Sequence, residues 1–153
     1  MLHVCFVCTG NICRSPIAEK VFAEHLRRAE LDHRVRVSSA GTGGWHSGDP
    51  ADPRTEEVLR RNGYVTKHRA RQVGVEHTDA DLLVALDAGH VRSLRRITDH
   101  PDRVRLLRSF DPDAGDDLDV PDPYYGGDSG FDDVLDLIEA SMPGLLDWVR
   151  QRL

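Results

Sequence analysis

The sequence predicts a single-domain α/β protein with a four-stranded parallel sheet and helices on both of its faces. The main observation is that short apolar runs alternate along the chain with longer segments whose apolar residues recur at helical spacing. Strands that alternate with helices pair in parallel, because each helix returns the chain to the edge where the next strand starts. The length of 153 residues suits one domain with a substantial core, which we expect to span residues 1–153.

The first half of the chain contains two strand–helix units. Leu2–Val7 is a continuous apolar run, typical of a buried strand, and the helix Ser15–Ala29 that follows has a proline in its first turn. Val35–Ser39 is expected as the second strand. After a loop over residues 45–52, a helix is predicted over Pro53–Asn62, because Gly63 is suited to end it.

The second half repeats this alternation. Leu82–Leu86 is the third expected strand, and Asp87 is interpreted as the cap of a helix that runs to about Ile97. A fourth strand is predicted at Val104–Leu107, followed by a long loop over residues 110–130. The last helix, Phe131–Arg150, has an apolar stripe, and its Pro143 is expected to kink it.

The segment CTGNICRS, residues 8–15, joins the first strand to the first helix. A loop in this position binds anions, because free backbone N–H groups and the positive end of the helix dipole point to the same place. In this segment five residues separate a cysteine from an arginine. Enzymes with a cysteine nucleophile use this spacing in the loop that surrounds a phosphate. The sequence therefore predicts a phosphate-binding loop after the first strand, and the alternative is a buried cysteine that ends a strand.

Each residue type in this loop suits one part of phosphate-ester hydrolysis. Cys8 would attack phosphorus as a thiolate, which a helix terminus and a nearby cation favour. The planar fork of Arg14 would bind two phosphate oxygens, and Ser15 would donate a hydrogen bond to the thiolate. Gly10 is expected to adopt the positive backbone angles that turn N–H groups inward. The other residues expected to bind phosphate or support the loop are Thr9, Asn11, Ile12 and Cys13.

A second segment, DPYYGG at residues 122–127, supplies the proton that a leaving oxygen requires. A bound phosphate dianion repels a carboxylate, so Asp122 beside it would hold its proton and act as the general acid. Tyr124 and Tyr125 offer apolar faces to an aromatic leaving group. Taken alone, the segment is more readily interpreted as an acidic surface turn, because Asp, Pro and Gly dominate turns.

Together these two segments resemble those of the low-molecular-weight protein tyrosine phosphatases, and the resemblance extends over essentially the whole chain. It implies that Cys8 is the nucleophile, Arg14 binds phosphate and Asp122 is the general acid. The reaction implied is hydrolysis of phosphotyrosine in proteins through a phosphocysteine intermediate, with inorganic phosphate as product. The resemblance also implies cleft walls at Trp45 and Tyr124 and a loop braced by Asn11, Ser15, Ser39 and His68. The chain departs from some members at Ser38, where they carry aspartate, and at the Gly43-Gly44 pair.

Three alternative functions are open to a chain with this loop. Enzymes that prefer phosphoarginine resemble the loop but carry threonine in its middle, whereas Ile12 suits an aromatic ester better than a charged guanidinium. An arsenate reductase would need relay cysteines downstream, and none follows Cys13. A non-catalytic phosphoprotein-binding module would need neither the nucleophile nor the acid. We therefore expect a metal-free protein tyrosine phosphatase that uses no cofactor.

The three cysteines have different expected roles. Cys5 and Cys8 are three residues apart on a strand, so they face opposite sides and Cys5 belongs to the core. Cys13 shares the loop with Cys8, and the family resemblance implies that the two form a reversible disulfide under oxidation. The alternative is that Cys13 only packs beneath the loop.

Composition narrows the partners and the location. The net charge of −6 disfavours general nucleic-acid binding. The sequence has no apolar stretch long enough to span a membrane and no signal-like N-terminus. We expect a cytoplasmic protein, with export by a route that needs no signal peptide as the alternative. His46 is interpreted as a surface residue rather than part of the cleft rim, and the other histidines apart from His68 are also expected at the surface.

Overall fold

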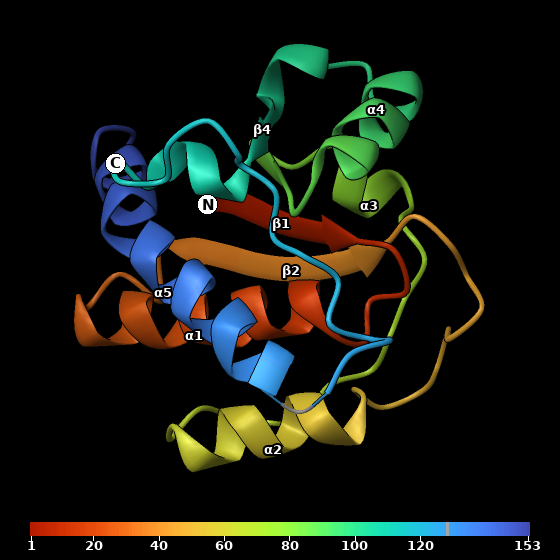
Figure 1. The fold of residues 1–153 in the computed structure, drawn as a ribbon. Helices are drawn as coiled ribbons and strands as arrows, with labels where there is room; N and C mark the ends of the chain where they lie inside the picture. Colours follow the sequence, from red (N-terminus) through yellow and green to blue (C-terminus); the bar gives the residue numbers. More distant parts are fainter. Residues whose placement is uncertain (128) are drawn as a thin grey trace.

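The computed structural model describes residues 1–127 and 129–153 and contains the predicted parallel sheet (Figure 1). The strand order is β2-β1-β3-β4, so the first strand lies inside the sheet. Val4 pairs with Val37 of β2 on one side and with Leu82 of β3 on the other. The strands are β1 (Leu2–Cys8), β2 (Val35–Gly41), β3 (Leu82–Ala85) and β4 (Val104–Leu106).

Helices cover the two faces of the sheet unequally (Figure 1). The helices α1 (Arg14–Arg28), α2 (Pro53–Arg61) and α5 (Ser129–Arg150) lie on one face, and α3 (Val75–Thr78) and α4 (Ala88–Ile97) lie on the other. Alternate residues of β1 divide between the two cores: Phe6 packs edge-on against Phe22 of α1, at 5.8 Å between ring centroids, whereas Cys5 packs with Leu94 of α4. Both faces of β1 are therefore buried, which explains its unbroken apolar run.

Most predicted elements are present, with differences at their ends. The first two strands extend to Cys8 and Gly41, whereas the fourth ends at Leu106. Three short helices were not predicted: α3, η1 (Pro101–Arg103) and η2 (Leu107–Phe110). Pro143 lies inside α5, which runs on past it. Asp128, within the predicted long loop, lies outside the described residues.

The topology brings the ends of three strands and two helices to one edge. Cys8 ends β1, Gly41 ends β2, and Asp87 lies two residues after the end of β3. Because parallel strands all present their carboxyl ends at the same edge, residues far apart in the sequence meet there. Among the described residues, no helix is both long enough and apolar enough to cross a membrane.

Candidate active site

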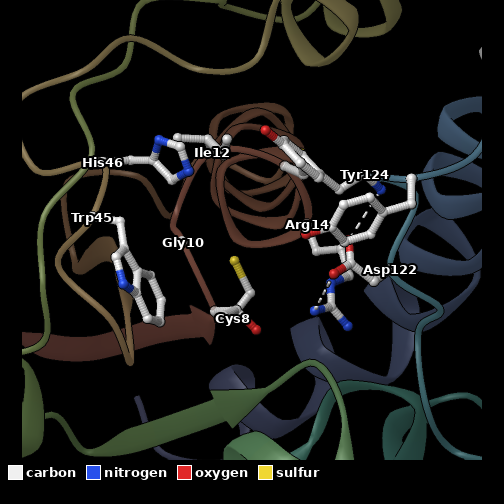
Figure 2. A pocket seen from close by; sticks show the side chains of 11 residues that line it. Cys8, Gly10, Ile12, Arg14, Trp45, His46, Asp122 and Tyr124 are labelled. Atoms are coloured by element: carbon white, nitrogen blue, oxygen red, sulfur yellow. Dashed lines mark hydrogen bonds and ion pairs between the residues drawn. The ribbon is translucent and has the colours of Figure 1, made fainter.

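A cavity of about 350 Å³ opens at this edge of the sheet. Figure 2 shows the Cys8 sulfur at its centre, with Trp45 and His46 on one side and Asp122 and Tyr124 on the other. The segment 8–14 forms the floor, and the loop that precedes α5 forms one wall. The cavity therefore unites the two segments singled out in the sequence, although Asp122 comes more than a hundred residues after Ser15.

Most carbonyl groups of the loop are hydrogen-bonded to groups outside it. The Thr42 and Gly43 N–H groups donate to the carbonyls of Cys8 and Thr9, at 2.9 and 3.0 Å, and the Asp52 N–H donates to Ile12 at 3.0 Å. The N–H groups of residues 10–13 donate to no acceptor within the described part of the chain. This geometry leaves a row of free N–H donors at the start of α1, as an anion site requires.

Two backbone positions make the loop's curvature possible. The positive φ that turns the loop is at Asn11, with a value of 58°, so the expectation that Gly10 supplies it is wrong. Asparagine tolerates this left-handed conformation, and here hydrogen bonds hold it. Gly41 lies against the loop so closely that a Cβ there would be 2.6 Å from the Thr9 carbonyl oxygen. The glycine at the end of β2 is thus required by close approach.

A directed chain of hydrogen bonds ends at the Cys8 sulfur. The Asn11 side-chain amide donates to the Ser15 hydroxyl at 2.8 Å and to the Ser39 hydroxyl at 3.0 Å. Because the Ser15 oxygen already accepts from Asn11, its own proton is available for the Cys8 sulfur, 2.9 Å away. A donor at this position stabilises a thiolate and, later, the cysteine as a leaving group.

Two further hydrogen bonds, from His68 and Arg71, fix the Asn11 backbone and side chain. His68 Nε2 donates to the Asn11 carbonyl oxygen at 2.7 Å, and the Arg71 N–H donates to Asn11 Oδ1 at 3.0 Å. Burial lowers the pKa of His68 below its usual value, so the imidazole is held mainly in its neutral form. The structure thus brings together the predicted braces around one residue: Asn11, Ser15, Ser39 and His68.

Arg14 is almost completely buried and has three partners. Its Nη1 donates to Asp87 Oδ2 at 2.8 Å and to the Val120 carbonyl oxygen at 2.9 Å. Its Nη2 lies 3.7 Å from Asp122 Oδ2, the ion pair drawn in Figure 2. The guanidinium is therefore oriented by Asp87 and Val120, while its second nitrogen faces the acid.

Asp87 and His90 are site residues that the sequence interpretation missed. Asp87 caps α4 as expected, accepting from the His90 N–H at 3.0 Å, but it also orients Arg14. The expectation that His90 lies at the surface is wrong, because only 4% of the residue is exposed. Burial lowers its pKa to about 4, which keeps the ring neutral near pH 7. The signal that could have revealed this pair is the three-residue spacing of a capping box directly after a buried strand.

His90 connects the helix cap to the phosphate loop. Its Nδ1 accepts from the Asp87 N–H at 3.2 Å, which places the proton of the neutral ring on Nε2. That Nε2–H donates to the Thr9 hydroxyl at 2.9 Å. The Thr9 side chain is thereby fixed beside the nucleophile, with its own hydroxyl proton still available.

The acid loop is fastened to the phosphate loop through a second missed pair, Asp52 and Arg54. Asp52 caps α2, and its backbone N–H donates to Ile12 of the loop. Arg54 pairs with the Asp52 carboxylate and donates to the Tyr124 carbonyl oxygen at 3.0 Å. Within the acid loop, the Tyr124 N–H donates to Asp122 Oδ1 at 3.0 Å. This chain of contacts sets where the Asp122 carboxyl lies relative to the floor.

The walls of the cavity are aromatic and largely exposed. The exposed fraction is 74% for Trp45 and 92% for Tyr125, and the Tyr124 and Tyr125 rings meet edge-on at 4.9 Å. Ile12 adds a buried apolar surface to the floor. His46 also lines the cavity, which corrects its interpretation as a plain surface residue. A flat aromatic group fits between such walls.

The other two cysteines are buried thiols. Burial raises the pKa of Cys5 and of Cys13 to about 12. Cys5 packs into the core on the α4 side of the sheet, as expected, whereas Cys13 belongs to the core on the α1 side together with Cys8. All three are free thiols in this structure, so the predicted Cys8–Cys13 disulfide stays a prediction.

Comparisons with known proteins identify the family of this chain. Residues 3–153 match the family described as low molecular weight phosphotyrosine protein phosphatase. Low molecular weight protein-tyrosine phosphatase A of Mycobacterium tuberculosis is 61% identical over 153 residues, which cover 99% of this chain and 94% of the relative.

Two solved structures share the whole fold. A protein tyrosine phosphatase from Entamoeba histolytica has a TM-score of 0.93 at 30% identity, covering 99% of this chain and 98% of its own. YfkJ from Bacillus subtilis has a TM-score of 0.91 at 37% identity, covering 99% and 96%. The chain belongs to the low molecular weight phosphotyrosine protein phosphatase family.

Proposed function

We propose that this protein hydrolyses phosphotyrosine in proteins and that Cys8, Arg14 and Asp122 carry out the chemistry. The observation that carries the proposal is the hydrogen bond from Ser15 to the Cys8 sulfur, at the centre of a loop whose N–H groups are free. A buried thiol with a dedicated donor and a ready-made anion site is suited to attack phosphorus. Membership of the family supports the same assignment.

The first step would transfer the phosphoryl group to the enzyme. The Cys8 thiolate attacks phosphorus in line, while the loop N–H groups and Arg14 bind the three equatorial oxygens. The bond from phosphorus to the tyrosine oxygen breaks, and Asp122 donates its proton to that oxygen. The phosphoryl group of the substrate would replace Asp122 as the partner of Arg14 Nη2, which lies 3.7 Å from Asp122 Oδ2 in this structure.

The second step would release phosphate. Asp122, now ionised, takes a proton from water as the water attacks the phosphocysteine. Cys8 leaves as a thiolate, which the Ser15 hydroxyl stabilises, and inorganic phosphate departs. Because this cycle needs a reduced thiol, we also propose that the protein acts in a reducing compartment such as the cytoplasm. We further propose that residues 1–153 act as one domain.

Phosphotyrosine is the proposed substrate because both the walls and the floor of the cavity present apolar surfaces. Trp45, Tyr124 and Tyr125 offer apolar faces at the entrance, and Ile12 offers one at the base. A phenyl ring would bury these surfaces, whereas the charged guanidinium of phosphoarginine would be poorly solvated beside Ile12.

Steady-state rates on matched peptides carrying phosphotyrosine, phosphoserine or phosphoarginine test the substrate. We expect phosphotyrosine to be preferred by about a hundredfold or more, the scale on which a lost aromatic contact and a mismatched charge act together. A higher kcat/KM for phosphoarginine would overturn the substrate assignment while leaving the cysteine chemistry intact.

The roles of the residues are tested separately. Cys8→Ser should abolish turnover of para-nitrophenyl phosphate but still bind phosphate. Asp122→Ala should slow phenyl phosphate, a poor leaving group, by about a hundredfold or more, and para-nitrophenyl phosphate much less. Equal slowing of both esters would show that Asp122 is not the acid.

A further inference from the structure

A second cavity, of about 610 Å³, opens beside the free edge of β2. The segment that connects α2 with α3 passes the carboxyl end of β2 and forms the opposite side (Figure 1). We call this cavity the basic cleft. It shares no lining residue with the cavity around Cys8. Its lining comprises Glu19, Lys20, Arg36, Val37, Ser38, Ser39, Lys67, His68, Arg69, Arg71, Glu76 and His77.

Positive charge gathers in this cleft although the chain as a whole carries a net charge of −6. Five lining residues are cationic and two are acidic. Glu19 is already engaged, because it accepts from the Ser39 hydroxyl and pairs with Lys20 at 3.1 Å. Within the described part of the chain, no ion pair is formed by the other four cations, Arg36, Lys67, Arg69 and Arg71. Their charges are therefore available to a ligand.

A buried histidine adds a directional donor to these charges. The expectation that His77 lies at the surface is wrong, since only 3% of it is exposed. Its Nδ1 accepts from the Gly74 N–H at 2.9 Å, so the proton of the neutral ring is on Nε2. No group among the described residues accepts a hydrogen bond from that Nε2–H. Among the described residues, Arg108 Nε is the only buried side-chain polar atom that lacks a partner, so the Nε2–H of His77 is open to the cleft that the residue lines. A bound anion would accept a hydrogen bond from it there.

Charges from both sides of the cleft act on His77. Burial lowers its pKa below the usual value, and the nearby charges of Arg36 and Arg71 lower it further, whereas Glu76 opposes them. Arg36 belongs to β2, and Arg71 belongs to the segment on the other side of the cleft. The ring thus lies where guanidinium groups from both sides act together.

We propose that the basic cleft binds a small molecule that carries two or more adjacent phosphoryl groups. Three arginines present planar forks that match phosphate oxygens, and His77 adds a neutral donor. The volume lies within the range of small-molecule sites, about 300 to 1,000 Å³, and exceeds that of the cavity around Cys8. A ligand with several phosphoryl groups would meet all four unpaired cations at once.

The cleft also contacts the supports of the phosphate loop. Ser39 and His68 line the cleft, and both are bonded to Asn11. A ligand in the cleft would therefore contact residues that support the loop around Cys8, but it would not occupy the loop itself. The two sites can be loaded and measured separately.

Isothermal titration calorimetry with tripolyphosphate tests the proposal, with phenylphosphonate at saturating concentration to occupy the loop around Cys8. We expect one equivalent of tripolyphosphate to bind, at least about ten times more tightly than citrate, which carries about one charge fewer and carries it on carboxylates. In NMR spectra the ring of His77 should shift, and the ring of the exposed His33 should not.

Charge-reversal variants separate this site from general attraction of anions. The double variant R36E/R69E should weaken tripolyphosphate binding by about tenfold or more, because two of the cations that converge on the cleft are reversed. The matched control R95E/R96E changes the net charge equally on an exposed part of α4 and should alter the affinity by less than about twofold. Activity on para-nitrophenyl phosphate should be retained by both.

Three results would overturn the proposal: no binding of tripolyphosphate to the blocked protein, tighter binding of citrate than of tripolyphosphate, or equal weakening by R36E/R69E and R95E/R96E. None of these results bears on the role of Cys8, because turnover of aryl phosphates is measured independently.

Discussion

Arg14 reaches from the phosphate loop to Asp87, which caps α4, and its Nη1 donates to Asp87 Oδ2 over 2.8 Å. The pair joins two segments that follow neighbouring strands, β1 and β3. The arginine that we propose to bind phosphate is therefore oriented before substrate arrives, and the helix cap is part of that orientation.

Asp87→Asn tests this pair, because asparagine also caps helices but lacks the charge. We expect kcat for para-nitrophenyl phosphate to fall by about tenfold, the scale of a lost charge-assisted hydrogen bond. The inhibition constant of phosphate should change less, since removing a negative charge partly offsets the looser Arg14. Steady-state kinetics with phosphate as inhibitor measures both, and the exposed Asp113→Asn is the control. An unchanged kcat would contradict the orienting role.

Arg54→Ala tests the link between the acid loop and the phosphate loop. The arginine donates to the Tyr124 and Gly126 carbonyl oxygens and lies 4.7 Å from the centre of the Phe131 ring. Its loss should displace Asp122, so turnover of phenyl phosphate should fall by about tenfold while para-nitrophenyl phosphate changes by about twofold. Arg61→Ala, on the same helix, should leave both rates unchanged. Equal losses for the two esters would show that Arg54 acts on something other than the acid.

His90 should make the protein less stable in mild acid. Its pKa is about 4 in the folded protein and 6.5 in the unfolded chain, so the unfolded state binds more protons between these values. The contribution of His90 to the free energy of unfolding is fully present above pH 6.5. It is lost as the pH falls toward 4, and the loss is at most about 3 kcal/mol.

Urea unfolding of the wild type and of His90→Asn between pH 7.5 and 4.5 measures this contribution. The variant should show a shallower loss, although the lowered pKa values of His3, His68 and His77 leave part of the slope in place. The exposed His33→Asn should keep the wild-type slope. Identical slopes for wild type and His90→Asn would refute the assignment.

Cys13 should protect Cys8 from irreversible oxidation. Peroxide converts the Cys8 thiolate to a sulfenic acid, and the Cys13 sulfur then attacks it, releasing water and forming a disulfide. Because burial raises the pKa of Cys13 to about 12, closure needs a rare thiolate and should accelerate with rising pH.

Recovery of activity by dithiothreitol after peroxide treatment, with mass spectrometry of the Cys8–Cys13 link, measures this protection. Cys13→Ser should recover little activity. Cys5→Ser, in the core on the other side of the sheet, should recover as the wild type does. Full recovery by Cys13→Ser would mean that the residue only packs beneath the loop.

Local patterns were sufficient to predict the layered fold. The apolar run of β1 and the alternation of strands and helices identified the sheet, since burial on both faces leaves a mark on each strand. The four residues of α3 carry no periodic pattern, so that helix could not be predicted. The turn of the phosphate loop was assigned to Gly10 on residue type, whereas hydrogen bonds to its neighbours hold Asn11 there instead.

The site was predictable where it lies in one segment and unpredictable where it is assembled from several. Cys8, Arg14 and Asp122 were identified from two short motifs. The partnership of Arg14 with Asp87 joins residues 73 positions apart, and no local pattern marks such a contact. His90 is polar and was expected at the surface, but its ring is buried because both nitrogens have partners.

The phosphate loop is buried and the walls of the cavity are exposed, so residues of the loop tolerate substitution less than residues of the walls. Substitutions at Trp45 or Tyr125 remove few packed neighbours, so they change the stability of the fold little. Changes around Asn11 or Gly41 would disturb groups that have no room to move. Descendants of such a protein can therefore acquire new protein targets by drift at the rim while retaining the same rate on small aryl phosphates.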